Sequence, residues 1–131
     1  MTMLEHILST RAYWAGQWVD LWSIPHTLFG VMVAFIAVLI GVRLVIAFGA
    51  AAALAAFWEV FERVSGVGHT EAPTNSLMDM VLALIGFGLG VLILRRIKSE
   101  DGRRVFIAIV AVIWGLSNFL GWLAYTHYGA P

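Results

Sequence analysis

Cysteine is absent from the 131-residue chain. This absence excludes disulfide bonds, thiolate catalysis and zinc–thiolate sites, and it leaves the redox environment of the protein undecided. Any bound metal ion must therefore be held by histidine, aspartate, glutamate or asparagine side chains.

Charge is also scarce. Charged residues make up 12% of the chain, hydrophobic residues make up 61%, and the formal net charge is zero. A neutral chain has no basic field to attract a phosphate backbone, so we expect no nucleic-acid partner. The mean hydropathy of +0.89 is far above the balance of a soluble domain, and it predicts a protein surrounded by membrane lipids.

Four apolar stretches are long enough to cross a bilayer as helices. A hydrocarbon core of about 30 Å requires about 20 apolar residues in a helix, which satisfies its own backbone hydrogen bonds. The sequence therefore predicts an all-α polytopic membrane bundle that forms a single domain over residues 1–131. A tight turn at Arg43 and a charged loop, Arg95 to Arg104, separate neighbouring spans. The four transmembrane helices are expected at about 26–42, 44–62, 77–94 and 105–125.

The segment before the first span has a different pattern. Residues 3–22 are too polar to cross a membrane, but Trp14, Trp18 and Trp22 recur every four residues and so share one helical face. Because tryptophan favours the water–lipid boundary, we expect residues 1–24 to form an interfacial amphipathic helix that ends at Pro25. The alternative is a helix that docks on a partner subunit.

Lysine and arginine residues are distributed unevenly between the predicted loops. Only Arg11 and Arg63 fall on one side of the bundle. The positive-inside rule therefore places the first and third loops in the cytoplasm and both termini on the non-cytoplasmic side. The basic residues on the cytoplasmic side are Arg43, Arg95, Arg96, Lys98, Arg103 and Arg104.

Polar residues inside or beside the spans gather near the outer boundary. A charged side chain at bilayer depth costs at least a few kcal/mol, so such residues usually pair, reach water or mark a functional site. His26 opens the first span and Asp79 begins the third, while two glutamates close the second. The expected ligand-binding residues are His26, Glu59, Glu62, Asn75, Asp79 and Asn118.

Helical periodicity indicates that these residues face the interior of the bundle. Asp79 shares a face with Gly86 and Gly90, and small residues at this spacing mark where a neighbouring backbone approaches closely. Glu59 and Glu62 lie on the alanine-rich side of their helix. We therefore expect the polar residues to converge on one cavity that is open to the outside.

Two chemical roles are open for this cavity. His26, Glu59, Glu62 and Asp79 supply the oxygen and nitrogen ligands for a divalent metal ion. Alternatively, crowded carboxylates raise one another's pKa, and one acts as an acid while its neighbour acts as a base. The interpretation without a function is that the carboxylates are hydrated at the membrane boundary and that Arg63 pairs with one of them.

One part of the chain also resembles a known group of proteins. The pattern is Phe57-Trp58-Glu59-Val60-Phe61-Glu62, followed by Asp79-Met80 and two glycines. It resembles small bacterial inner-membrane proteins of the YjdF type, which are similar to the wider VanZ-like group. In those proteins a histidine opens an early helix, a W-E-x-x-E segment closes the next, and an acidic residue precedes two helix glycines. The matching residues are His26, Glu59, Glu62, Asp79, Gly86 and Gly90.

The resemblance covers about His26 to Leu94, and it has departures. Asn75 stands where the YjdF type often has another acid, and Ala83 stands where VanZ-like proteins commonly have an asparagine. A ligand arrangement that requires either group is altered here. The resemblance implies a cell-envelope setting in the bacterial inner (plasma) membrane, but it supplies neither a substrate nor a reaction.

Three functions are compatible with these patterns. The first is an outward-facing acidic pocket that binds a divalent cation or an amphiphilic cell-envelope ligand. In one form of this hypothesis the protein is a lipid-modifying enzyme. The second is a non-catalytic accessory subunit of a larger membrane complex, docked through its tryptophan-bearing helix and glycine-rich faces. The third is a small proton or cation transporter that works as a homo-oligomer. The sequence leaves open whether the protein is an enzyme.

Overall fold

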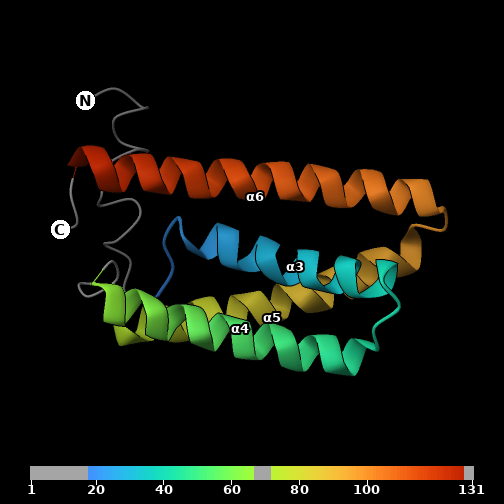
Figure 1. Ribbon diagram of the computed structural model, residues 1–131, viewed down its shortest axis with the longest axis horizontal. Coiled ribbons are helices and arrows are strands. Elements are labelled where there is room, and N and C mark those ends of the chain that lie inside the picture. The colour runs from blue at the N-terminus through green and yellow to red at the C-terminus, as the bar shows by residue number, and fades with distance from the viewer. Residues whose placement is uncertain (1–17, 67–71, 129–131) are drawn as a thin grey trace.

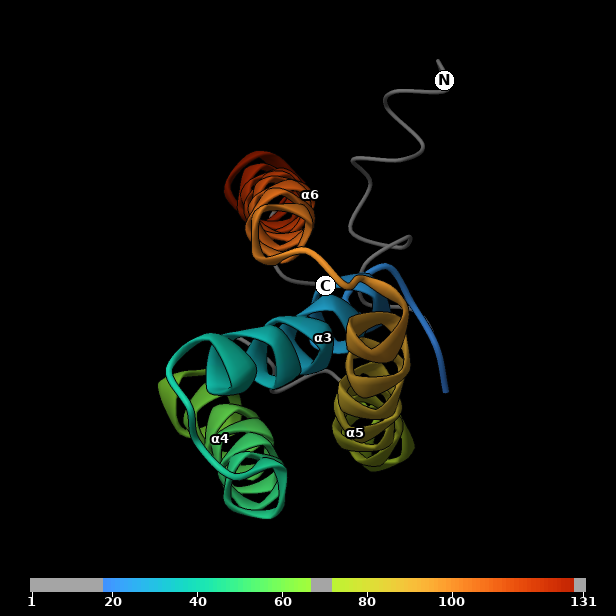
Figure 2. The same ribbon diagram turned by 90° about the vertical axis from the view of Figure 1, so that its right-hand side faces the viewer.

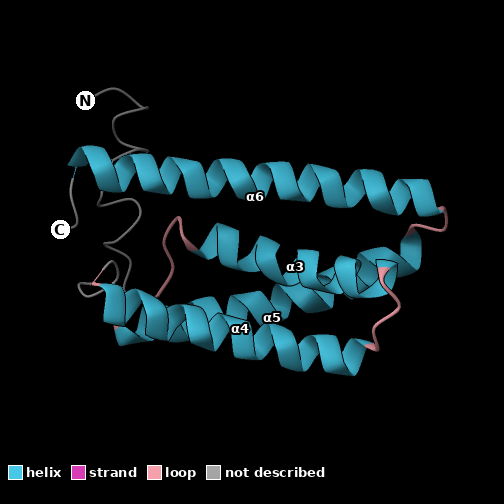
Figure 3. Cartoon of the chain, in the orientation of Figure 1, coloured by secondary structure: helices cyan, strands magenta, loops and turns pink. Residues whose placement is uncertain are grey.

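The computed structural model describes residues 18–66 and 72–128, and these residues form α-helices and no strand (Figure 1) (Figure 3). The all-helical prediction is therefore confirmed for this part of the chain. The helices are α3 (Ser23–Leu39), α4 (Leu44–Ser65), α5 (Pro73–Arg96) and α6 (Glu100–Tyr128).

Successive helices run in opposite directions along the long axis of the bundle. The α3–α4 and α5–α6 turns lie at one end, and the end of α4 lies with the start of α5 at the other (Figure 1). Arg43 and the basic residues around the α5–α6 turn therefore share one end of the fold. Among the arginines and lysines of the described residues, Arg63, in the last turn of α4, is the one that lies toward the opposite end.

Three of the helices, α4, α5 and α6, are long and apolar enough to cross a membrane, whereas α3 has only 17 residues. The outer faces of the long helices expose large apolar side chains such as Val45, Leu92 and Leu116. Exposed apolar surface of this extent is costly in water and is covered by lipid in a bilayer. These features indicate a membrane protein.

Helix α3 is the central element of the bundle and packs against each of the other three helices (Figure 2). Its closest neighbour is α5, because glycines remove the side chains that would separate the two backbones. A Cβ atom at Gly30 would collide with the Ala83 carbonyl oxygen, and one at Gly86 would collide with the Thr27 carbonyl oxygen. At Gly90 a Cβ would lie 2.9 Å from the Ala34 Cβ. The predicted role of the α5 glycines in close helix packing is confirmed.

The remaining buried surface is made largely of small residues. Ala47, Ala51 and Ala55 line the buried face of α4, and the two glutamates of that helix continue the same face. Phe35 fills the space between the alanines, and it stacks on Phe106 of α6 with ring centroids 4.8 Å apart. Small side chains let helices approach closely, as expected where lipid replaces water as the solvent.

The start of α3 differs from the sequence-based prediction. Pro25 lies in the first turn of α3 and does not end a preceding helix. Residues 18–22 form a turn, in which the Asp20 carboxylate accepts a hydrogen bond from the Trp22 amide at 2.8 Å. Proline is tolerated in the first helical turn because amides there have no partner within the helix. Most of the predicted interfacial helix, residues 1–17, lies outside the described residues.

The α5–α6 connection is also shorter than predicted. Helix α5 continues to Arg96 and α6 begins at Glu100, so only residues 97–99 are left of the charged loop expected at 95–104. The Ser99 hydroxyl accepts a hydrogen bond from the Gly102 amide at 3.1 Å, which satisfies one free donor at the start of α6. At its other end α5 starts at Pro73, so Asp79 lies inside the helix and not at its first turn.

The close packing of α3 on α5 can be tested with two matched glycine substitutions. We expect Gly86→Ala to lower the melting temperature, because overpacking typically costs about 1–3 kcal/mol. Gly88 is the control, since a Cβ there meets nothing within 4 Å. Gly88→Ala should leave stability unchanged or raise it slightly, because alanine favours the helix more than glycine. Thermal unfolding in detergent, followed by circular dichroism, measures both variants. An equal effect of the two substitutions contradicts the packing described above.

Candidate functional site

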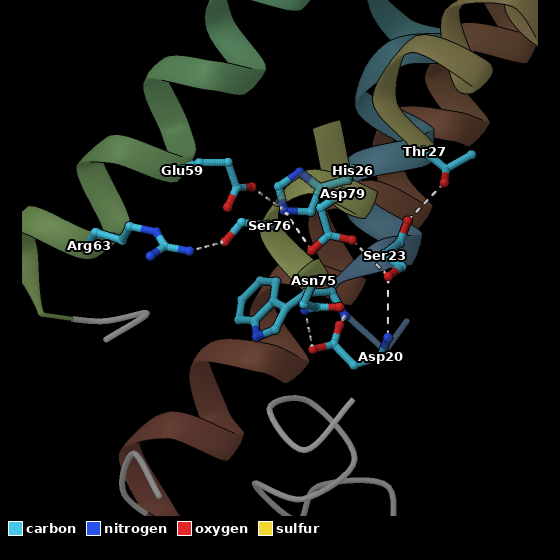
Figure 4. A network of polar contacts seen from close by, with 10 residues as sticks. Asp20, Ser23, His26, Thr27, Glu59, Arg63, Asn75, Ser76 and Asp79 are labelled. Atoms are coloured by element: carbon cyan, nitrogen blue, oxygen red, sulfur yellow. Dashed lines mark hydrogen bonds and ion pairs between the residues drawn. The ribbon is translucent and has the colours of Figure 1, made fainter. Parts of the chain in front are cut away.

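The buried polar side chains lie together where α3, α4 and α5 meet, at the end of the bundle opposite the basic turns (Figure 4). Helix α3 supplies its first turn, α4 its last turns and α5 its first turns. We call this group of residues the polar cluster. Its members are Ser23, His26, Glu59, Glu62, Asn75, Ser76 and Asp79.

The His26 imidazole lies between two carboxylates from different helices. Its Nε2 atom is 3.8 Å from Glu59 Oε1 and 3.8 Å from Asp79 Oδ2. The exposed fractions of the three side chains are only 10%, 7% and 1%, respectively. Screening by water is weak at such a site, so any charge on these side chains is costly unless an opposite charge lies nearby.

Asp79 is held in place by hydrogen bonds from α3. The Ser23 hydroxyl donates to Asp79 Oδ1 at 2.7 Å and accepts a hydrogen bond from the Asp20 amide at 3.3 Å. The Asp20 carboxylate in turn accepts a hydrogen bond from the Asn75 side-chain amide at 3.0 Å. These contacts join the start of α3 to α5 and fix the carboxylate that faces His26.

Glu59 and Glu62 are three residues apart and therefore project from one face of α4. Both are buried, and the exposed fractions of the whole residues are 5% and 6%. One ligand atom from each of His26, Glu59 and Glu62 lies within 4.8 Å of the other two. We call these three residues the triad.

The triad has the donor types and nearly the spacing of a metal site. Tetrahedral zinc with bonds of about 2.0–2.2 Å places two ligand atoms about 3.3–3.6 Å apart, so closing a spacing of up to 4.8 Å requires side-chain shifts of about an ångström. A set of two carboxylates and one imidazole suits borderline divalent cations such as Zn²⁺ or Mn²⁺. Among the described residues, the triad is the only group that meets this spacing.

The structure places the sequence-predicted site residues in three positions. His26, Glu59, Glu62 and Asp79 converge, as expected. Asn75 joins the cluster through Asp20. Within the described residues, Asn118 forms no hydrogen bond with a carboxylate. Its side-chain amide donates to the Trp114 carbonyl oxygen of its own helix at 2.8 Å. It instead lines a neighbouring groove that also touches His26.

Sequence reasoning missed Asp20, Ser23 and Thr27 as parts of this network, and it considered Arg63 only as the partner of a carboxylate. Asp20 and Ser23 were included in an interfacial helix, whereas their D-x-x-S spacing before a proline is typical of a helix start. Thr27 donates to the Ser23 carbonyl oxygen at 2.8 Å, and the Arg63 guanidinium donates to the Ser76 hydroxyl at 3.0 Å. Arg63 thus lies beside the acidic side chains, as Figure 4 shows.

Comparison of the chain with protein-family models, with curated proteins and with solved structures found no match. The resemblance to the YjdF type and the VanZ-like group therefore stays a prediction.

The contact between Ser23 and Asp79 can be tested with two serine substitutions. Ser23→Ala removes a hydrogen bond to a buried carboxylate, and such bonds contribute about 1.5–3 kcal/mol. We expect a lower melting temperature than for wild type. Ser117→Ala is the control, because the Ser117 hydroxyl donates only to the Trp114 carbonyl oxygen within α6. Thermal unfolding in detergent compares the two variants. Equal melting temperatures would show that the Ser23 bond does not stabilise the fold.

Proposed function

We propose that this protein is a four-span bacterial inner-membrane protein whose triad binds a divalent metal cation on the non-cytoplasmic side. The observation that carries the proposal is the convergence of His26, Glu59 and Glu62, of which the two glutamates are buried, with ligand atoms within 4.8 Å of one another. The resemblance to YjdF-type proteins, which rests on the same residues, agrees with an envelope setting.

The charge of the cluster supports a bound cation. Glu59, Glu62 and Asp79 are three carboxyl groups in a small volume with little access to water. Burial of like charges is unfavourable unless protons or cations offset them. A divalent cation at the triad offsets two negative charges at once and gives each carboxylate a strong partner.

Asp79 has a different role in this proposal. Its Oδ1 atom already accepts the Ser23 hydroxyl, and its Oδ2 atom faces His26 Nε2 at 3.8 Å. This is the same imidazole nitrogen that faces Glu59, so Asp79 lies on the metal side of the ring and not at the second ring nitrogen. Asp79 therefore adds negative charge beside the metal position, and the three side chains of the triad leave coordination positions for water or for an oxygen of a ligand.

The four-span topology is supported by the length and surroundings of α3. Its 17 residues extend over about 25 Å at 1.5 Å per residue, which is somewhat less than a hydrocarbon core of about 30 Å. Short spans are accommodated by local thinning of the bilayer. The end that carries Arg43 and the α5–α6 turn faces the cytoplasm, and the polar cluster faces outward.

Metal binding can be measured directly on the detergent-purified protein. After incubation with Zn²⁺ or Mn²⁺ and removal of free metal, elemental analysis should find one ion per chain. His26→Gln, Glu59→Gln and Glu62→Gln should each lose it, while Asp79→Asn should retain the site with a lower affinity, because it removes a negative charge beside the ion. The control is Glu100→Gln, because Glu100 is an exposed residue that pairs with Arg104. Wild-type protein without metal, or full occupancy in all three triad variants, contradicts the proposal.

The absence of cysteine gives a clean test of the topology. Two exposed positions suit single cysteine substitutions. They are Ser99, in the α5–α6 turn, and Thr126, near the end of α6. In intact cells a membrane-impermeant maleimide should label Thr126→Cys and not Ser99→Cys. Permeabilised cells provide the control, since both variants should then react. Labelling of Ser99→Cys alone in intact cells would reverse the orientation.

A further inference from the structure

A groove of about 360 Å³ lies next to the triad, between α4 and α6 and above α3. Its walls are aromatic and aliphatic, with Phe29 from α3, Leu54 and Trp58 from α4, and Trp114 from α6. We call this feature the aromatic groove. The exposed fractions of Leu54 and Trp58 are 51% and 43%, so the groove opens sideways toward the region that lipid occupies.

The groove is amphiphilic, because it has polar side chains at His26 and Asn118 in an otherwise apolar lining. His26 is shared by the groove and the triad. A molecule that fills the groove therefore reaches the proposed metal site with its polar end. The Arg63 guanidinium, which bonds Ser76 of the same cluster, adds a positive charge on that side.

We infer that the aromatic groove binds a single hydrocarbon chain whose phosphate head group contacts the cation at the triad. This inference rests on the proposed function, since the carboxylates without a cation would repel an anionic head group. The apolar lining suits a hydrocarbon chain, and the two polar side chains in it, His26 and Asn118, suit one polar head group. The groove volume of about 360 Å³ falls within the range of about 300–1,000 Å³ for small-molecule sites.

Two kinds of lipid carry a hydrocarbon chain and a phosphate head group. One is a single-chain lipid phosphate, and the other is a diacyl phospholipid with one chain in the groove. We commit to the single-chain source, because one groove adjoins the triad and a diacyl phospholipid would leave its second chain outside it. In either case the interior walls shield the chain, while the open coordination positions of the cation accept phosphate oxygens. The phosphate supplies the hard oxygen ligands that complete a site built from two carboxylates and one imidazole.

The test uses the full chain in detergent, with dodecyl phosphate as the probe and native mass spectrometry to measure binding. We expect one dodecyl phosphate per chain, with an affinity at least tenfold higher with Zn²⁺ than with a chelator. Glu59→Gln should abolish this metal dependence. Leu54→Trp should weaken binding at least tenfold by filling the groove. Leu89→Trp is the matched control on α5, because Leu89 is 45% exposed and does not line the groove.

Each other outcome has a defined meaning. Equal binding to wild type and Leu54→Trp overturns the groove as the site. Equal binding with and without Zn²⁺, in protein that elemental analysis shows to carry the ion, overturns the inference and leaves the proposed metal site intact. Absence of the ion overturns both. Displacement of half of the bound dodecyl phosphate by an equal concentration of phosphatidic acid identifies a diacyl phospholipid as the source, and weaker displacement identifies a single-chain phosphate.

Discussion

The close approach of α3 and α5 is the constraint on which the rest of the structure depends. Gly30 and Gly86 bring each backbone against a carbonyl oxygen of the other helix, and no larger residue fits at either position. In lipid, where apolar side chains gain little by leaving their surroundings, such packing is a main source of helix association. The same contact sets the register in which Ser23 meets Asp79 and His26 lies between two carboxylates.

The polar cluster illustrates how a membrane protein keeps charged groups at depth. Part of it, from Asp20 through Ser23 to Asp79, is held by hydrogen bonds that fix the start of α3 on α5. The other part, on α4, places two glutamates against one imidazole. The hydrogen bonds of the first part hold the helices in place, and the second part provides metal-ligand atoms. The cluster is therefore suited to holding a cation in a fixed geometry.

Periodicity and composition were sufficient to predict much of this arrangement. The four helices, the turn at Arg43, the alanine face of α4 and the inward direction of Asp79 all follow from spacing along a helix. Local hydrogen bonds set the start of α3 and the length of the α5–α6 turn, and helical spacing does not predict either feature. Asp20 and Ser23 form a helix start where tryptophan spacing favoured a continuous helix, and the α5–α6 turn is short because Ser99 caps α6. The position of Asn118 could not be predicted, because it depends on how α6 lies across α3.

The central claim is that His26 binds a divalent cation together with the glutamates of α4. Pulsed electron paramagnetic resonance of Mn²⁺-loaded protein tests it most directly, because the method detects a nitrogen nucleus bound to the ion. We expect a directly coordinated imidazole nitrogen in the wild-type protein and its loss in His26→Gln. A spectrum without a coordinated nitrogen, or one that His26→Gln leaves unchanged, would contradict it.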